Sequence, residues 1–145
     1  MCASHISPDL PGWPPGTVAI LSTAGESPHA IPVSTGVRAG PRRVLFALAA
    51  GRESLRRLCA DPRVAFTLLC EGDVAVTAHG TARVVADPLP GADGVVAVAL
   101  DVEEVQDHGQ PRFVIEAGVC WRWVDSQAQA RDADVRAALA ALARI

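Results

Sequence analysis

The chain has 145 residues, a length that fits one domain, and half of them are hydrophobic, with 26 Ala and 18 Val. All thirteen basic residues are Arg, and Lys, Asn and Tyr are absent, which excludes lysine Schiff bases, a lysine-containing phosphate loop, a tyrosine acid and N-glycosylation. The net charge of −3 lacks the basic footprint of a nucleic-acid binder, and no stretch approaches the ~20 apolar residues of a membrane span.

The N-terminal half predicts an arm followed by an antiparallel meander. Residues 1–16 are rich in proline and show no periodicity, so we expect an extended arm. Apolar, β-branched runs predict strands at 17–23, 29–38 and 44–49, with Pro32 at an edge or bulge position. Because short turns join these runs, they favour an antiparallel sheet.

A change of hydrophobic period then predicts a short helix at 52–60. Leu55, Leu58 and Cys59 would share its apolar face, and Asp61-Pro62 would end it. The arginines of this segment would lie off that face.

The remaining chain predicts further strands and a terminal helix. Strands are expected at 63–70, 74–85, 95–105 and 119–124, and an amphipathic helix at 127–145. Gly80 interrupts its strand as a bend or a close backbone approach would. In the last strand Trp121 and Trp123 would share one face.

This order of elements predicts a mainly β fold. We expect an antiparallel β-barrel with a short helix after the third strand and a C-terminal helix. The expected division is an arm at 1–16, a barrel domain at 17–126 and the helix at 127–145.

Residues with catalytic chemistry are scattered. The four His and four Cys residues show neither metal-ligand spacing nor a CxxC motif, so the sequence predicts no metal site and assigns no catalytic residue. The N-terminus has neither the basic run nor the apolar run of a secretory signal. We therefore expect reduced, mostly buried thiols in a cytoplasmic protein.

One local feature suits an anion. Gly51-Arg52-Glu53-Ser54 opens the short helix directly after an apolar strand. Free N–H groups at a helix start, an Arg fork and a Ser hydroxyl together suit a phosphate group. These residues alone favour the alternative, a capped surface helix with solvated arginines.

Three ordered segments carry a resemblance to a known family. They are Val18 to Val33 (VAILSTAGESPHAIPV), Leu55 to Thr67 (LRRLCADPRVAFT) and His79 to Val85 (HGTARVV). Together they resemble the FMN-binding split-barrel family related to pyridoxamine 5′-phosphate oxidase. The resemblance covers about residues 17–86, and Gly118 to Val124 (GVCWRWV) is similar to the closing strand of some members.

The resemblance implies an antiparallel split barrel that forms a homodimer, with two flavin sites in the interface. The flavin phosphate would lie on Arg52 and Ser54. The ring would lie against Val33, Ser34 and Thr35, with Leu48 and Ala49 nearby. Trp121 and Arg122 would reach the ring from the partner chain.

Several positions depart from the family. Ser54 stands where the oxidase carries Lys, Arg57 stands where the family usually has Asn, and nothing matches the residues that hold pyridoxal phosphate. The resemblance therefore implies an FMN-dependent oxidoreductase with a small-molecule substrate other than vitamin B6.

Three alternatives stay open. An F420-dependent reductase is one, because an Arg-only, Ala- and Val-rich chain is typical of a GC-rich genome. The others are a degenerate dimeric flavin-binding module without turnover and a barrel that binds nothing.

Overall fold

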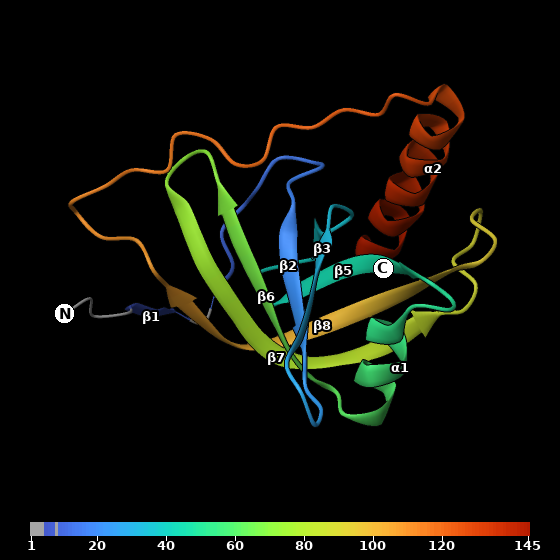
Figure 1. Ribbon diagram of the computed structural model, residues 1–145, viewed down its shortest axis with the longest axis horizontal. Coiled ribbons are helices and arrows are strands. Elements are labelled where there is room, and N and C mark those ends of the chain that lie inside the picture. Colours follow the sequence, from blue (N-terminus) through green and yellow to red (C-terminus); the bar gives the residue numbers. More distant parts are fainter. Residues whose placement is uncertain (1–4, 8) are drawn as a thin grey trace.

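The computed structural model describes residues 5–7 and 9–145 and is built mainly of strands (Figure 1). Cys2, which the sequence predicts as a reduced thiol, lies outside the described residues. The elements in chain order are β1 (His5–Ser7), β2 (Ala19–Thr23), β3 (His29–Val33), β4 (Val37–Arg38), β5 (Arg43–Ala49), α1 (Glu53–Ala60), β6 (Arg63–Cys70), β7 (Val74–Ala86), β8 (Val95–Asp107) and α2 (Ser126–Ala143).

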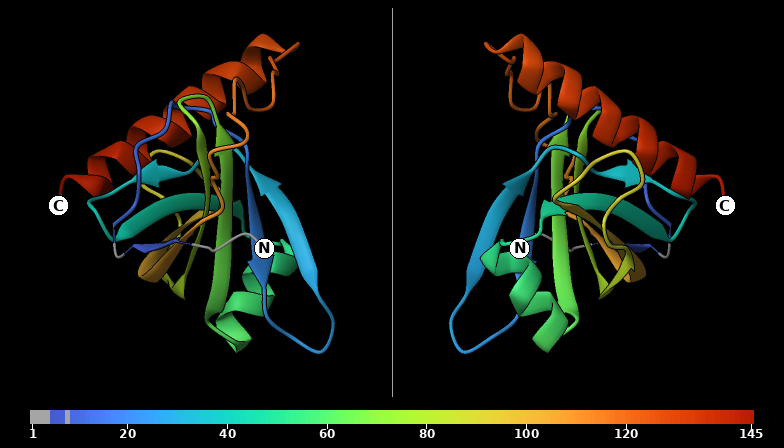
Figure 2. Two further views of the ribbon diagram at one scale, coloured as in Figure 1. Left: turned by 90° about the vertical axis from the view of Figure 1, so that its left-hand side faces the viewer. Right: turned by 90° about the vertical axis from the view of Figure 1, so that its right-hand side faces the viewer.

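The strands form one antiparallel sheet in the order β3-β2-β6-β7-β8-β5-β4, and β1 pairs with β8. The 13-residue strands β7 and β8 bend along their length and curl the sheet into a half-barrel (Figures 1 and 2). Helix α1 lies at one end of the barrel, and α2 lies across the outside of the sheet. The structure thus confirms the predicted fold class, an antiparallel split barrel with a short mid-chain helix and a C-terminal helix.

The bend in β7 begins at Gly80, where the pairing with β8 shifts register between His79 and Gly80. A Cβ atom placed on Gly80 would lie 2.0 Å from the carbonyl oxygen of Asp101. Only glycine allows the two backbones to approach this closely. The close approach predicted at Gly80 is therefore confirmed.

Apolar side chains fill two clusters, one on each face of the sheet. Inside the barrel, Phe46 and Phe66 are fully buried, with ring centroids 5.9 Å apart, and Leu58 of α1 closes the end. On the outside, Val135 and Leu139 of α2 pack against the β5–β8 surface. Among the described residues, no helix has both the length and the apolar character needed to cross a membrane.

Two predicted strands differ from the structure. The run at 29–38 forms the two short strands β3 and β4, and Pro32 lies on β3 at the sheet edge, as expected. Residues 119–124 are not a strand. They belong to the crossover segment, residues 108–125, which runs along the top of Figure 1 from β8 to α2. Side-chain contacts rather than a strand ladder hold this segment.

The burial of α1 also differs in part from the prediction. Leu55 and Leu58 are buried as expected, but Cys59 is exposed and Ser54 takes a buried position. The third buried position therefore lies one residue before Leu55 rather than one residue after Leu58. The side chain of Arg57, predicted to lie off the apolar face, is only 17% exposed.

Candidate functional site

Two chain segments meet beside the start of α1, one linking β3 to β4 and the other linking β5 to α1. Between them lies a pocket of about 280 Å³, called here the β3–β5 pocket. Its lining residues are Pro32, Val33, Ser34, Thr35, Ala47, Leu48, Ala49 and Arg52. Six of the nine residues that the sequence predicts for cofactor binding thus line one pocket.

The Thr35 side chain holds the two walls of this pocket together. The Ala47 N–H donates to Thr35 Oγ1 at 3.0 Å, and the Thr35 hydroxyl is 3.5 Å from the Ala47 carbonyl oxygen. Trp13 braces the same link, because its Nε1–H donates to the Gly36 carbonyl at 3.0 Å. The pocket is therefore fixed in shape by contacts between segments distant in sequence.

Arg52 stands at the N-cap of α1, and its carbonyl accepts hydrogen bonds from the N–H groups of Leu55 and Arg56. Within the described chain, no side chain caps this helix start. The Arg52 side chain is exposed and has neither an ion pair nor a hydrogen bond to any described residue. An unpaired guanidinium at an uncapped helix start is a suitable place for a phosphate group.

The carboxylate of Glu53 does not oppose the binding of a phosphate group beside Arg52. It forms ion pairs with Arg56 and with Arg57, the second at 3.4 Å. The hydrogen bond from Arg56 is the main cause that lowers the pKa of Glu53. The negative charge in the first turn is therefore already matched by two arginines, while the positive charge of Arg52 is left over.

Ser54 lies outside the pocket lining. Its side chain is buried, and its Oγ lies 3.0 Å from Nε2 of His29 at the start of β3. The hydroxyl therefore ties α1 to β3. Next to it, Arg57 donates to the carbonyl of Ser27 at 2.8 Å and holds the β2–β3 turn against α1.

Trp121 and Arg122 lie in the crossover segment, away from the β3–β5 pocket of their own chain. The Nε1–H of Trp121 donates to the Gly16 carbonyl at 2.9 Å, and its ring meets Trp123 edge to face and the guanidinium of Arg136. Trp121 lines a different pocket, of about 340 Å³. Arg122 is exposed, and none of the described residues pairs with it.

The sequence analysis did not assign Pro32 and Ala47 to the cofactor site, although both line the β3–β5 pocket. Each is next to a predicted site residue in the sequence, Val33 or Leu48, and this adjacency was the available signal. The described residues contain no group of three His, Cys, Asp or Glu residues placed to hold a metal ion.

Three cysteines are described, and all three are free. Cys70 is buried, and burial is the first cause that raises the pKa of its thiol. Cys59 and Cys120 are exposed, so the prediction of mostly buried thiols is wrong for the described cysteines. Cys59 is exposed because the buried face of α1 lies one residue away, and Cys120 because it lies in the crossover segment.

Comparison of the sequence with family models and with curated proteins finds no match. Solved structures do match. A candidate pyridoxamine 5′-phosphate oxidase from Lactobacillus delbrueckii has a TM-score of 0.54 and 20% identity, over 61% of this chain and 83% of its own. A FAD-binding protein from Mesorhizobium loti has a TM-score of 0.52 and 15% identity, over 62% and 82%.

A heme-binding protein from Mycobacterium smegmatis matches with a TM-score of 0.53 and 20% identity, over 82% of this chain and 56% of its own. These three similarities cover between 61% and 82% of this chain. The chain therefore has the antiparallel split-barrel fold of pyridoxamine 5′-phosphate oxidase-like, flavin-binding and heme-binding proteins, as its three sequence motifs predicted.

Proposed function

We propose that this protein binds FMN in the β3–β5 pocket and acts as an FMN-dependent oxidoreductase on a small molecule other than vitamin B6. One observation carries the proposal. Six residues expected at a flavin site line a single pocket, and that pocket contains the unpaired Arg52 at the uncapped start of α1.

Each part of the pocket has a task in this proposal. The planar fork of Arg52 can hold two phosphate oxygens at once, and the first N–H groups of α1 add weaker donors. Val33 and Leu48 are buried apolar residues that keep water from the flavin ring. Thr35 fixes the distance between the two walls.

The bound flavin supplies the electron or hydride transfer, and the protein supplies binding, orientation and electrostatics. This division fits a pocket whose lining contains no Asp, Glu, His or Cys. The residues of this chain thus need only hold the cofactor and admit a substrate.

The proposal includes a homodimer in which Trp121 and Arg122 of a second chain complete each pocket. In their own chain these residues lie away from it.

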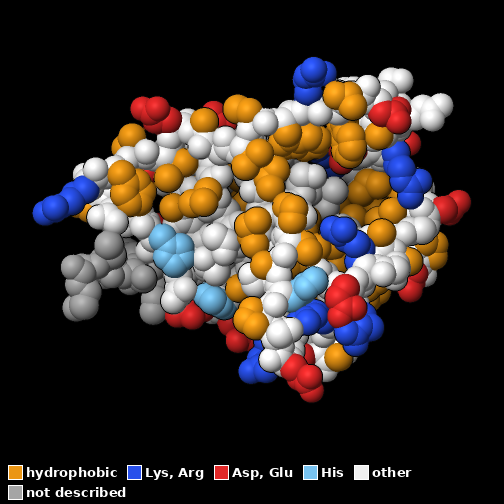
Figure 3. All heavy atoms as spheres, in the orientation of Figure 1, with side chains coloured by type: hydrophobic (Ala, Val, Ile, Leu, Met, Phe, Trp, Pro, Cys, Tyr) orange, Lys and Arg blue, Asp and Glu red, His pale blue; other side chains and the backbone are white. Residues whose placement is uncertain are grey.

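Apolar side chains are spread over the face shown in Figure 3. The exposed large hydrophobic residues of the sheet include Ile20 on β2, which is 40% exposed, and Leu69 on β6, which is 52% exposed. Large apolar patches on a soluble protein mark association surfaces.

The test is to purify the protein, denature it and identify the released cofactor by mass spectrometry. The proposal expects one FMN per chain and reduction of the bound flavin by NAD(P)H, followed by reoxidation when an acceptor is added. F420 in the released fraction would replace the proposal with the F420-dependent alternative. Bound FMN that never turns over would favour the degenerate binding module.

Heme is a less suitable occupant. His29, His79 and His108 each have Nε2 in a hydrogen bond, to Ser54, Gln106 and Thr77 respectively. An iron ligand from Nε2 of any of them would have to break that bond first. A Soret band in the purified protein would contradict this part of the proposal.

A further inference from the structure

A second pocket, of about 230 Å³, lies between the C-terminal end of α2 and the outer face of the sheet. It is called here the arginine pocket. It shares no residue with the β3–β5 pocket, so the inference below does not depend on the proposed function. Its lining residues are Ala39, Arg43, Leu45, Arg83, Val85, Ala99, Leu142, Ala143 and Ile145.

The sheet register sets the floor of this pocket. Ala99 on β8 pairs with Leu45 on β5 and with Arg83 on β7. Two residues further along β8, Asp101 pairs with Arg43 on β5. All five therefore lie on the sheet face that α2 covers. Leu45 and Ala99 are buried and form an apolar floor.

Asp101 holds the two arginines side by side. Nε of Arg43 donates to one carboxylate oxygen at 3.1 Å, and Nε of Arg83 donates to the other at 2.8 Å. Partial burial would raise the pKa of Asp101, but these hydrogen bonds outweigh burial and lower it. The carboxylate is therefore charged at neutral pH and fixes both guanidiniums.

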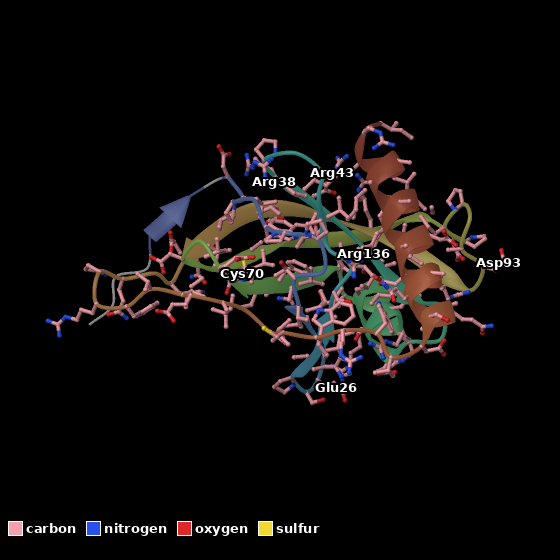
Figure 4. All side chains as sticks on the ribbon, turned by 90° about the horizontal axis from the view of Figure 1, so that it is seen from above. Glu26, Arg38, Arg43, Cys70, Asp93 and Arg136 are labelled. Atoms are coloured by element: carbon pink, nitrogen blue, oxygen red, sulfur yellow. The ribbon has the colours of Figure 1, made fainter. Side chains whose placement is uncertain are left out.

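Each arginine uses only Nε for Asp101. In the part of the chain that the structure describes, the Nη groups of Arg43 and Arg83 have no hydrogen-bond partner. Asp101 therefore uses only part of the donor capacity of the two guanidiniums. Figure 4 shows Arg43 close to the C-terminal end of α2, where Leu142 and Ala143 provide an apolar wall.

We propose that the arginine pocket binds a small monocarboxylate with an aliphatic or aromatic body. The carboxylate would accept hydrogen bonds from the free Nη groups of Arg43 and Arg83, and the apolar body would lie on Leu45 and Ala99 beneath Leu142. The unused Nη donors match the oxygen atoms of a carboxylate, and the apolar lining distinguishes this ligand from inorganic phosphate or acetate.

The test compares three probes by ligand-observed NMR titration of the full chain. Octanoate has both the charge and the apolar body, octanol lacks the charge, and acetate lacks the apolar body. We expect octanoate to bind at least about tenfold more tightly than either of the others, because charge-assisted hydrogen bonds and apolar burial both contribute. Octanoate binding no tighter than octanol or acetate would overturn the proposal.

Variants then locate the site. The double change Arg43→Gln with Arg83→Gln should weaken octanoate binding about tenfold, and Ala143→Phe should weaken it by filling the pocket while leaving both arginines. Arg112→Gln, which removes an exposed arginine of the crossover segment that pairs with none of the described residues, is the matched control and should change nothing. Equal loss in Arg112→Gln and the double variant, or full binding in Ala143→Phe, would overturn the location. Circular dichroism checks that each variant is folded.

Discussion

Arg52 differs from the other arginines of its helix in having no partner among the described residues. Arg56 pairs with Glu53, and Arg57 is committed to Glu53 and the β2–β3 turn. The three arginines between positions 52 and 57 therefore have two different roles. Two hold the helix and the hairpin together, and one is left to meet an anion.

Replacing Arg52 with Ala should weaken FMN binding by about 1.5–3 kcal/mol, or roughly ten- to a hundredfold in Kd, because a charge-assisted hydrogen bond to phosphate is lost. Flavin fluorescence titration measures the change. The control is Arg112→Ala, which removes an exposed arginine of the crossover segment that also has no partner among the described residues, and its Kd should match that of the wild type. Equal Kd values in both variants would place the phosphate elsewhere.

Thr35 acts on the pocket through the backbone of β5. Thr35→Val keeps the shape of the side chain but leaves the Ala47 N–H without its acceptor, so we expect a loss of about 1–3 kcal/mol in the free energy of unfolding. Urea denaturation checks this value. Thr35→Ser retains the hydroxyl and should recover most of the stability, and a Val variant as stable as the Ser variant would contradict the assigned role.

Among the elements, the three long strands β6, β7 and β8 were predictable from sequence. The predicted boundaries at 63–70, 74–85 and 95–105 lie within two residues of β6, β7 and β8. The buried residues of β6 alternate along the strand, whereas those of β8 form a continuous run that packs on both faces of the sheet. Residues 119–124 alternate equally well but form no ladder. They stay exposed, and the ring of Trp121 contacts Trp123 and Arg136. Periodicity alone cannot distinguish these two outcomes.

The candidate site was likewise predictable from the sequence only in part. Most pocket residues lie within the strands predicted at 29–38 and 44–49, and the resemblance to the flavin family named six of them. The orientation of Ser54 was not predictable, because it depends on His29, which is 25 residues away in sequence. Whether Arg52 has an ion-pair partner among the described residues also depends on where carboxylates distant in sequence lie in the fold, and sequence spacing does not reveal that.

The bend in β7 provides a test at the scale of the element. Gly80→Ala would place a Cβ against the backbone of Asp101, which cannot move without breaking the β7–β8 pairing. Overpacking of this kind costs about 1–3 kcal/mol or more. Thermal unfolding should show a lower Tm for Gly80→Ala and no change for the control Gly12→Ala, whose Cβ would meet nothing. Equal Tm values would contradict the account of the bend.

For the whole molecule, acid should weaken the fold through carboxylates that pair with arginine. The side-chain hydrogen bond from Arg63 lowers the pKa of Asp61 from 3.8 to about 2, and the pKa values of Glu53 and Asp101 are also lowered. Because these pKa values are lower in the folded than in the unfolded state, the stabilisation is present above about pH 4. It is lost as the pH falls towards 2.

Urea titrations between pH 5 and pH 2, at roughly half-unit steps, measure this dependence. The free energy of unfolding should fall over the range, and the fall should be shallower for Asp61→Asn, which removes one of the titrating groups. A free energy of unfolding that stays constant down to pH 2 would contradict the assignment.

The central claim concerns the whole chain, a split barrel whose β3–β5 pocket holds a flavin by its phosphate at Arg52. The most direct measurement compares the Kd of FMN with that of riboflavin, which has the same ring and sugar chain without the phosphate. The wild-type protein should bind FMN at least about tenfold more tightly, and Arg52→Ala should lose most of that preference. Equal binding of the two flavins by the wild type, or a preference for FMN retained in Arg52→Ala, would contradict the account.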